Sequence, residues 1–336
     1  MKHLLEVNHL EVGFKTYGGE VQAVRDVSFH IDKGEILAIV GESGSGKSVT
    51  VQTIMGLIPT PPGKIKNGKV LLEGRDLLKL SKRNMQKVKG SKISMVFQDP
   101  MTSLNPTMQV GKQIAESITT HQKIKGEEAK KRAIEMIRLV GISNPAERYH
   151  QYPHEFSGGM RQRIMIAIAL ACHPQVLVAD EPTTALDVTI QAQVLDLMKN
   201  LRDELGTSII LITHDLGVVA ETAERVAVMY GGMIVETAPV KEIFKNPRHP
   251  YTWGLLESIP DVDAEDKKRL IPIDGAPPDL FSPPKGCPFA PRCKYAMEVC
   301  VEAMPPAFSI GDGHEAKCWL NDSRTPALKE LAAGRA

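Results

Sequence analysis

One segment of the sequence has the residue types and spacing of a phosphate-binding loop: Gly41-Glu42-Ser43-Gly44-Ser45-Gly46-Lys47-Ser48. It directly follows residues 36–40, an apolar run typical of a strand buried on both faces of a sheet. Glycines let the backbone wrap so that its N–H groups point at phosphate oxygens. Lys47 supplies a cation for the β- and γ-phosphates, and Ser48 a hydroxyl for Mg²⁺. The preceding strand argues against a mere glycine-rich surface turn. The residues predicted to contact a nucleotide here are Gly41, Ser43, Gly44, Ser45, Gly46, Lys47, Ser48 and Val49.

Two acids follow a second apolar run, residues 176–179. A carboxylate at the end of a neighbouring strand can hold the Mg²⁺ shell, which is the role expected for Asp180. Glu181 lies just beyond the strand, where a carboxylate can polarise an attacking water as general base. The alternative is that both acids cap the start of a helix, since Pro182 follows and acids favour that position. These residues alone favour neither interpretation.

The elements around these motifs alternate between strands and helices. A third apolar run covers residues 208–213, and apolar residues at helical spacing precede it over residues 190–205. The alternation predicts an α/β core with a largely parallel sheet. Residues 101–162 interrupt it and are expected to form a helical insertion. From about Pro247 onward, closely spaced prolines predict a second, loop-rich region without long helices.

The composition indicates an ordinary globular protein. The 336 residues suit about two domains, and 42% hydrophobic with 24% charged residues is enough to bury a core. A net charge of +1 gives no indication of nucleic acid or of an anionic membrane surface. The longest apolar run, Ile164–Cys172, is too short for a membrane span, and the first residues lack the features of a secretory signal. We therefore expect a cytosolic chain.

A third motif, Ser157-Gly158-Gly159, lies at the start of a predicted buried helix, where it would present backbone N–H groups and a positive helix end to an anion. With this motif in place, residues 4–245 resemble the ABC ATPase family. The resemblance implies a P-loop NTPase cassette with a RecA-like core, an antiparallel β subdomain and a helical subdomain. It further implies that two cassettes sandwich two ATP molecules, each signature acting on the γ-phosphate bound by the other protomer.

Further motifs match the family in order. Gln98 resembles the Q-loop glutamine, which touches Mg²⁺ and the attacking water. Residues 185–187, Ala185-Leu186-Asp187, resemble the D-loop at the dimer interface, and His214 resembles the switch histidine. The resemblance thus implies that the catalytic residues are Glu181, His214 and Gln98. It implies that the magnesium ligands are Ser48, Gln98 and Asp180. For stacking on adenine, both Phe14 and Tyr17 are available; spacing favours Tyr17, and an ordinary surface aromatic is the alternative.

Four cysteines crowd the C-terminal tail at the spacing C-x5-C-x6-C-x17-C: Cys287, Cys293, Cys300 and Cys318. In a reducing compartment such a set is more often metal-binding or catalytic than disulfide-bonded. It can hold a zinc ion or an iron–sulfur cluster, and the open spacing favours the cluster because structural zinc prefers tighter pairs. Four unligated cysteines remain the alternative. Cys172 stands apart and is expected to pack in the core. Since the tail lies outside the nucleotide motifs, a Cys293→Ser variant is expected to bind ATP normally.

The tail narrows the resemblance. His249-Pro250-Tyr251-Thr252, Arg292 and the cysteines are similar to the C-terminal region of oligopeptide and dipeptide permease ATPases, some of which carry a [4Fe–4S] site. Gly159-Met160-Arg161 resembles the D-type subunit, whose partner usually has glutamine where Met160 stands. The D-type match implies a heterodimer with that partner. The permease-type tail implies a cassette over residues 1–246 and a metal-binding C-terminal domain over residues 247–336.

The resemblance also implies an assembly and a location. We expect a second ATPase subunit, two integral membrane permease subunits and an extracytoplasmic substrate-binding protein, with this chain peripheral at the cytoplasmic face of the membrane. ATP hydrolysis would then drive uptake of di- or oligopeptides. Nickel importers share much of the pattern, so nickel or another small solute stays open as cargo.

Two other classes of function compete with the transporter. Soluble ABC ATPases of DNA repair or translation clamp nucleic acid, but repair members insert a long coiled coil and translation members carry two cassettes. Here no sustained heptads separate Lys47 from Ser157, and one cassette is present. No nucleic acid partner is therefore expected. A redox or metal sensor, in which ATP is secondary, would rest on the cysteines alone.

Overall fold

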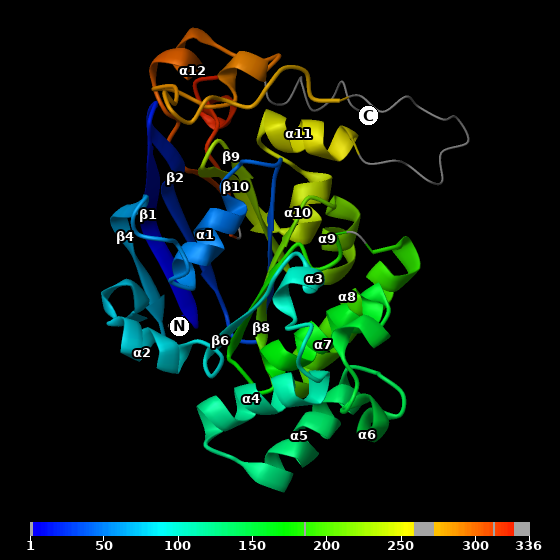
Figure 1. Cartoon of the computed structure of the whole chain (residues 1–336). Coiled ribbons are helices and arrows are strands. Elements are labelled where there is room, and N and C mark those ends of the chain that lie inside the picture. The colour runs from blue at the N-terminus through cyan, green and yellow to red at the C-terminus, as the bar shows by residue number, and fades with distance from the viewer. Residues whose placement is uncertain (1–2, 185, 259–271, 312, 326–336) are drawn as a thin grey trace, which may run out of the picture.

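Two sheets organise the chain in the computed structural model, which describes residues 3–184, 186–258, 272–311 and 313–325 (Figure 1). The strands are β1 (Leu5–Thr16), β2 (Gly19–Ile31), β3 (Ile36–Val40), β4 (Gly63–Leu72), β5 (Arg75–Asp76), β6 (Ile93–Val96), β7 (Val176–Asp180), β8 (Ser208–Thr213), β9 (Arg225–Tyr230), β10 (Met233–Pro239), β11 (Phe308–Gly311) and β12 (His314–Ala316). The larger sheet has the order β11-β12-β10-β9-β3-β8-β7-β6, and the smaller has the order β2-β1-β4-β5.

Helices lie beside the larger sheet and also toward the bottom and the top of the molecule in Figure 1. They are α1 (Lys47–Ile54), α2 (Lys82–Val88), α3 (Pro100–Ser103), α4 (Val110–Gln122), α5 (Gly126–Leu139), α6 (Pro145–Arg148), α7 (Gly158–Leu170), α8 (Val188–Leu205), α9 (Leu216–Thr222), α10 (Val240–Lys245), α11 (Pro250–Glu257) and α12 (Glu298–Glu302).

The centre of the larger sheet is parallel and buried on both faces. Strand β3 pairs in parallel with β8 and β9, and β7 pairs in parallel with β8 and β6. All five residues of β3 are buried, and they alternate between two apolar clusters because successive side chains of a strand point to opposite faces. Ile36, Ala38 and Val40 face one cluster, whereas Leu37 and Ile39 face the other. The predicted α/β core with a largely parallel sheet is confirmed.

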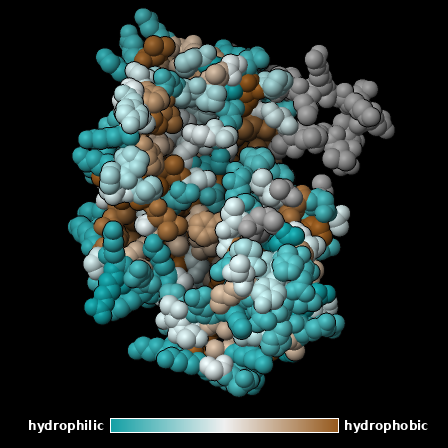
Figure 2. Space-filling view, viewed as in Figure 1, coloured by the Kyte–Doolittle hydropathy of each residue, from teal (hydrophilic) through white to brown (hydrophobic). Residues whose placement is uncertain are grey.

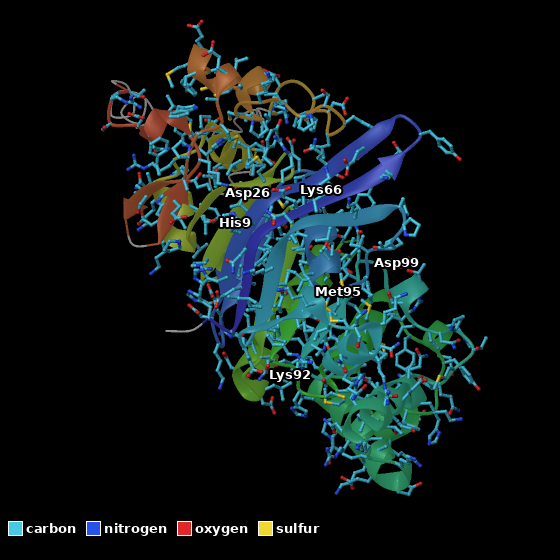
Figure 3. The ribbon with its side chains drawn as sticks, turned by 90° about the vertical axis from the view of Figure 1, so that its left-hand side faces the viewer. His9, Asp26, Lys66, Lys92, Met95 and Asp99 are labelled. Atoms are coloured by element: carbon cyan, nitrogen blue, oxygen red, sulfur yellow. The ribbon has the colours of Figure 1, made fainter. Side chains whose placement is uncertain are left out.

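The smaller sheet is antiparallel and irregular. The pairing of β1 with β2 shifts its register between Val7 and Leu10, which marks a β-bulge. His9 and Asp26 lie at this irregularity with φ of 50° each, a conformation that His and Asp tolerate better than most residues. Their side chains meet, with His9 Nδ1 2.6 Å from Asp26 Oδ1 (Figure 3). Bulges increase the local twist, so the β1–β2 hairpin is bent rather than flat.

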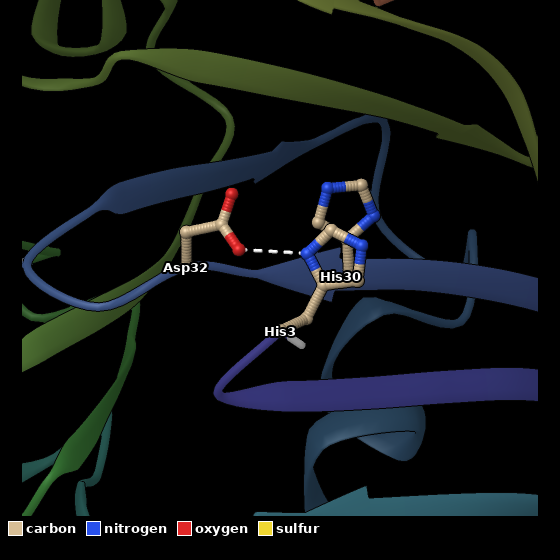
Figure 4. Close-up of side chains that lie close together, drawn as sticks. All are labelled: His3, His30 and Asp32. Carbon is tan, nitrogen blue, oxygen red and sulfur yellow. Dashed lines mark hydrogen bonds and ion pairs between the residues drawn. The ribbon is translucent and has the colours of Figure 1, made fainter. Parts of the chain in front are cut away.

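The start of the chain is fixed to the end of β2 by two histidines and an acid (Figure 4). The His3 and His30 rings stack with centroids 3.7 Å apart, and His3 Nδ1 lies 2.7 Å from Asp32 Oδ1. Among the described residues, these three form the one group of possible metal ligands whose ligand atoms all lie within 4.8 Å of one another. Stacked rings do not converge on one point, however, and Arg225 Nη1 already contacts His30 Nε2. Burial, with Arg225 adding to it, lowers the pKa of His30 to about 4, and the group is a structural contact rather than a metal site.

Helices α3 to α6 occupy residues 100–148, between β6 and α7. The amphipathic pattern of α5 explains how they pack, because its buried residues, Ala129, Ala133, Met136 and Ile137, recur at helical spacing. These side chains join the same apolar cluster as the alternate residues of β3 that face this side. The helical region is thereby continuous with the core of the larger sheet.

The C-terminal tail completes the larger sheet. Strand β12 pairs antiparallel with β10, placing Ala316 opposite Glu236, and β11 pairs with β12. Glu236 is 1% exposed and accepts hydrogen bonds from the backbone N–H groups of Arg248 and His249, from Thr252 Oγ1 and from His314 Nε2. A buried carboxylate needs such partners. The division at residue 246 into two domains stays a prediction.

The surface in Figure 2 is mainly hydrophilic, with separate hydrophobic patches. Within the described part of the chain, none of the helices combines the length and the apolar character that a membrane span requires.

The buried bond between His314 and Glu236 gives a test of how the tail is held. His314 is 2% exposed, and replacing it by alanine (His314→Ala) removes one of the donors to the buried carboxylate of Glu236. We expect the free energy of unfolding to fall by about 1–3 kcal/mol. The thermal unfolding midpoint, followed by circular dichroism, should fall by several degrees. The matched control is His150→Ala, at an exposed position, which should leave the midpoint unchanged. Equal midpoints for both variants would contradict a stabilising role for the bond.

Candidate functional site

One edge of the larger sheet gathers the predicted nucleotide residues. Because β6, β7, β8 and β3 are parallel neighbours, their carboxyl ends lie side by side. A cleft of about 810 Å³ lies at this edge and separates the smaller sheet from the ends of the parallel strands. The residues that line it are Phe14, Val21, Ala23, Ser43, Gly44, Ser45, Gly46, Lys47, Ser48, Val49, Gln98, Glu181, His214 and Leu280. The structure thus brings together the phosphate loop, Gln98, Glu181 and His214, as the sequence predicted.

The phosphate loop connects β3 to α1 and needs glycine at two tight points. Gly41 has φ of 152°, and a Cβ there would lie 2.1 Å from the carbonyl oxygen of Met229. Gly46 has φ of 101°, and a Cβ there would lie 2.4 Å from the carbonyl oxygen of Ala23. No other residue fits either point without moving the neighbouring backbone. Lys47 begins α1, so the loop ends at a helix N-terminus, which favours anions.

Lys47 is buried and points back into its own loop. Its Nζ donates to the carbonyl oxygens of Gly41, at 2.7 Å, and Glu42, at 3.0 Å. Burial lowers the pKa of Lys47, and the nearby charges of Glu181, Asp180 and Glu42 oppose this shift. A buried ammonium group held among carbonyl oxygens gains from an incoming polyphosphate, because the phosphate oxygens supply the missing negative charge.

Ser48 and Asp180 form the oxygen pair expected of a magnesium site. Ser48 Oγ donates to Asp180 Oδ1 over 2.9 Å, which joins the start of α1 to the end of β7. Burial raises the pKa of Asp180, while the hydrogen bond from Ser48 lowers it. A hydroxyl and a carboxylate are hard oxygen ligands of the kind that Mg²⁺ prefers, so these two residues fit the ion. Gln98, the third predicted magnesium ligand, bonds instead to Glu181.

Glu181 is held in position from three sides. Gln98 Nε2 donates to Glu181 Oε2 over 3.0 Å, and Thr184 Oγ1 donates to the same oxygen over 2.9 Å. His214 Nδ1 lies 3.7 Å from Glu181 Oε1. The backbone of Glu181 has φ of +48°, a strained value for a residue with a side chain. These contacts fix the orientation of the Glu181 carboxylate at the cleft.

The helix-cap alternative for Asp180 and Glu181 does not hold. In the described part of the segment, residues 181–184 form a turn, and the next helix, α8, begins at Val188 with Asp187 as its N-cap. Asp187 Oδ1 accepts from the backbone N–H of Ile190 over 3.0 Å. Of the predicted D-loop, Asp187 is therefore an exposed cap at the start of α8, while Ala185 lies outside the described residues.

The two candidate aromatic residues lie in different surroundings. Phe14, on β1, lines the cleft beside the phosphate loop. Tyr17 lies in the turn between β1 and β2 and is fully exposed, and it does not line the cleft. The placement favours Phe14 over the predicted Tyr17, because Phe14 lines the cleft and Tyr17 does not.

The signature motif does not face the cleft of its own chain. Ser157 is the N-cap of α7, and its Oγ accepts from the backbone N–H of Met160 over 3.3 Å. Ser157 and Gly158 are exposed, while Gly159 is buried against Ile190. None of the three lines the cleft. The helix N-terminus predicted to bind an anion is therefore presented outward.

The four tail cysteines converge on one small pocket. Cys287, Cys300 and Cys318 are buried and Cys293 is half-buried, and all four line the same enclosed space together with apolar side chains. Burial raises the pKa of Cys287 to about 11 and also raises the pKa of Cys293 and Cys318, so thiolates would need a bound cation here. The donor set fits a thiophilic metal.

The spacing of the four sulfurs bears on which metal fits. Tetrahedral zinc with Zn–S bonds of about 2.3 Å would hold the sulfurs about 3.8 Å apart. No three of these cysteines, all within the described residues, meet within 4.8 Å. The four sulfurs are therefore not gathered at the spacing of a zinc site in this structure. Cys172 lies elsewhere, where its Sγ donates to the carbonyl oxygen of Ser117.

Several residues of the cleft were not foreseen from the sequence. Leu280, in the tail, lines the cleft, and its carbonyl oxygen accepts from the backbone N–H of Gln22 over 2.9 Å. Tyr251 and Arg292, quoted only as tail motifs, both bond to Glu42 in the phosphate loop. Both residues stand in tail segments that match the permease family, and this match was the signal that the sequence offered. The sequence does not show that their partner is Glu42.

Known proteins resemble this chain along its length. The sequence matches the ABC transporter family over residues 24–184 and the C-terminal region of oligopeptide/dipeptide transporters over residues 235–300. The oligopeptide transport ATP-binding protein OppD of Bacillus subtilis (strain 168) is 61% identical over 99% of this chain and 93% of its own length. The dipeptide transport ATP-binding protein DppD of the same strain is 56% identical over 96% of each chain. A solved ATP-binding cassette, dimeric and bound to ADP and phosphate in a post-hydrolysis state, has a TM-score of 0.63 and 28% identity over 70% of this chain and 98% of its own.

The position of Phe14 in the cleft gives a test of base recognition. Phe14→Ala should weaken ATP binding by about 1 kcal/mol or more, because stacking on a base is worth that much. Binding of tripolyphosphate, which has no base, should be unchanged in isothermal titration calorimetry. The matched control, Tyr17→Ala at the hairpin tip, should bind both ligands as the wild type does. A loss of ATP affinity in Tyr17→Ala but not in Phe14→Ala would reverse the assignment.

Proposed function

We propose a detailed function from the premise that this chain belongs to the ABC transporter family, among the ATP-binding proteins of oligopeptide and dipeptide transport. It is the ATPase subunit of a peptide importer, and it couples ATP hydrolysis to transport through membrane permease subunits. The observation that carries the detailed proposal is the shared cleft, in which Lys47, Gln98, Glu181 and His214 meet at one edge of the sheet.

Each residue of the cleft has a distinct task in hydrolysis. Lys47 and the loop backbone bind the β- and γ-phosphates. Ser48 and Asp180 would hold Mg²⁺, which would neutralise charge on the phosphate oxygens when bound. Glu181 accepts the proton of the attacking water, and Gln98 and His214 hold its carboxylate toward the cleft. Phe14 covers the adenine.

A second cassette completes the site. The N-terminus of α7 with Ser157 and Gly158 is exposed and lies outside its own cleft, so the γ-phosphate contact that it can make belongs to another chain. The similar solved cassette is itself a dimer. Met160 follows the signature glycines, as in the D-type subunits that this chain resembles, and we therefore assign a heterodimer with a partner of the other type. Two permease subunits and an extracytoplasmic binding protein complete the proposed importer.

The tail holds a [4Fe–4S] cluster on Cys287, Cys293, Cys300 and Cys318 in this proposal. Four sulfur ligands around one pocket, and the open spacing of the cysteines along the sequence, support it. The cargo is di- or oligopeptide, since the similar relatives are named for both. The same motor could serve nickel import, and the described residues do not contact cargo in either case, because permeases and binding protein would select it.

Exchanging the general base tests the catalytic assignment. Glu181→Gln should retain ATP binding but lower turnover by about 100-fold or more, because the water loses its base while phosphate and Mg²⁺ contacts remain. ATPase activity and peptide uptake should be measured on the importer purified from membranes through a tag on this chain. Lys47→Ala should instead weaken ATP binding itself.

The same purification tests the partners. Mass spectrometry should find two membrane subunits and a second cassette with the tagged chain. Near-normal turnover by Glu181→Gln would show that Glu181 is not the base. A vigorous ATPase formed by this chain alone would contradict the heterodimer.

The four-cysteine site is tested by metal analysis. Anaerobically purified protein should contain about four iron and about four sulfide per chain and should be brown. Cys300→Ser should lose the iron because it removes one ligand, whereas Cys172→Ser, a change at a buried cysteine outside the pocket, should keep it. One tightly bound zinc in colourless protein would overturn the cluster and retain the site. Folded, metal-free protein would exclude the site.

A further inference from the structure

The tail reaches the phosphate loop through one arginine. Arg292 Nη1 donates to Glu42 Oε2 over 2.7 Å and Arg292 Nη2 donates to Glu42 Oε1 over 3.1 Å, a two-pronged ion pair between the tail and the loop. The side chain of Arg292 is 5% exposed. Bidentate arginine–carboxylate pairs fix geometry as well as charge. Distance along the sequence predicts that the tail is separate from the nucleotide site. This premise is wrong, because the ion pair places the tail and the phosphate loop in direct contact.

Arg292 is itself held so that it cannot turn away. Nε donates to the carbonyl oxygen of Asp274 over 2.8 Å, Nη2 donates to that of Ile273 over 2.9 Å, and Nη1 also contacts the hydroxyl of Tyr230 at 3.2 Å. With the two bonds to Glu42, five contacts match the five N–H donors of a guanidinium group. A buried arginine whose N–H donors are all hydrogen-bonded keeps a fixed side-chain conformation.

Glu42 is held by Arg292 and by two further contacts. Its backbone N–H donates to the hydroxyl of Tyr251 over 2.8 Å, and its carbonyl oxygen accepts from Lys47 Nζ over 3.0 Å. Tyr251 is fully buried. Two tail residues thus hold Glu42, Tyr251 by its backbone and Arg292 by its side chain. Glu42 also accepts a hydrogen bond from Lys47, the lysine predicted to bind phosphate. Removing Arg292 would also leave the charge of Glu42 uncompensated near the phosphates.

The same arginine lies between two of the cysteines. It ends a short 3₁₀ turn, Ala290–Arg292, in which the N–H of Ala290 donates to the carbonyl oxygen of Cys287, and Cys293 follows directly. Both cysteines line the four-cysteine pocket. The turn that carries Arg292 is therefore anchored at each end by a predicted metal ligand.

We propose that Arg292 is a positioning residue that links the four-cysteine site to the phosphate loop, so that ATP affinity depends on the tail being folded around its metal. The proposal rests on the proposed function and adds a route from the tail to the nucleotide. Arg292 acts through Glu42 and does not touch ATP itself. By linkage, ATP should in turn protect the metal from chelators.

The first measurement compares ATP affinities of the full chain by titration calorimetry, with circular dichroism to check folding. Arg292→Ala should raise the dissociation constant about ten-fold. In the assembled importer it should raise KM for ATP and leave kcat at saturating ATP nearly unchanged, because Glu181, Gln98 and His214 are untouched. Arg324→Ala, at an exposed tail arginine, is the matched control and should change neither value. Arg292→Lys keeps the charge but loses the fork, so it should show a several-fold rise even if Arg292→Ala does not fold.

The second measurement tests the link. Cys300→Ser, at the pocket cysteine on α12, should raise the dissociation constant for ATP as the metal is lost, and should add little in an Arg292→Ala background. An unchanged constant in folded Arg292→Ala or Arg292→Lys would overturn the positioning role. Loss of metal in Cys300→Ser with wild-type ATP affinity, or fully additive effects in the double variant, would overturn the link. Wild-type protein that fails to bind ATP would refute the proposed function instead.

Discussion

Parallel pairing of β6, β7, β8 and β3 is the constraint on which the site depends. Each of these strands contributes one functional group just beyond its carboxyl end, and parallel register places the four ends at a single edge. A strand in the opposite direction would send its group to the far side of the molecule. The apolar faces of β3 hold this register, since a shift by one residue would exchange the two core clusters.

The sequence was informative wherever chemistry is written into a short segment. Lys47 and Ser48 follow a buried strand within one motif, and Asp180 and Glu181 end another, so local pattern was enough to predict both halves of the cleft. Spacing favours Tyr17, whereas in the structure Phe14 lines the cleft, because spacing along the chain does not report which ring of a bulged hairpin faces it.

Contacts between distant segments lie beyond such reasoning. Arg292 and Glu42 meet only because the tail folds back over the phosphate loop, and their residue types alone suit many partners. The same holds for Glu236, a buried acid inside a largely apolar strand, whose donors, His249 and His314 among them, come from beyond the predicted domain boundary at residue 246. Polar residues at such seams are satisfied by long-range geometry, which a single sequence does not specify.

The hairpin of β11 and β12 has a consequence for synthesis of the chain. Strand β10 finds its outer partner only when the segment around Ala316 has left the ribosome, long after the nucleotide motifs have been translated. Until then β10 is an open sheet edge of largely apolar residues, the kind of surface that recruits strands from other chains. Transcripts that end early would thus yield cassettes that contain every catalytic motif but expose an unpaired, aggregation-prone sheet edge. Pairing of the last strands removes this edge, and protein quality control can distinguish complete from truncated chains by it.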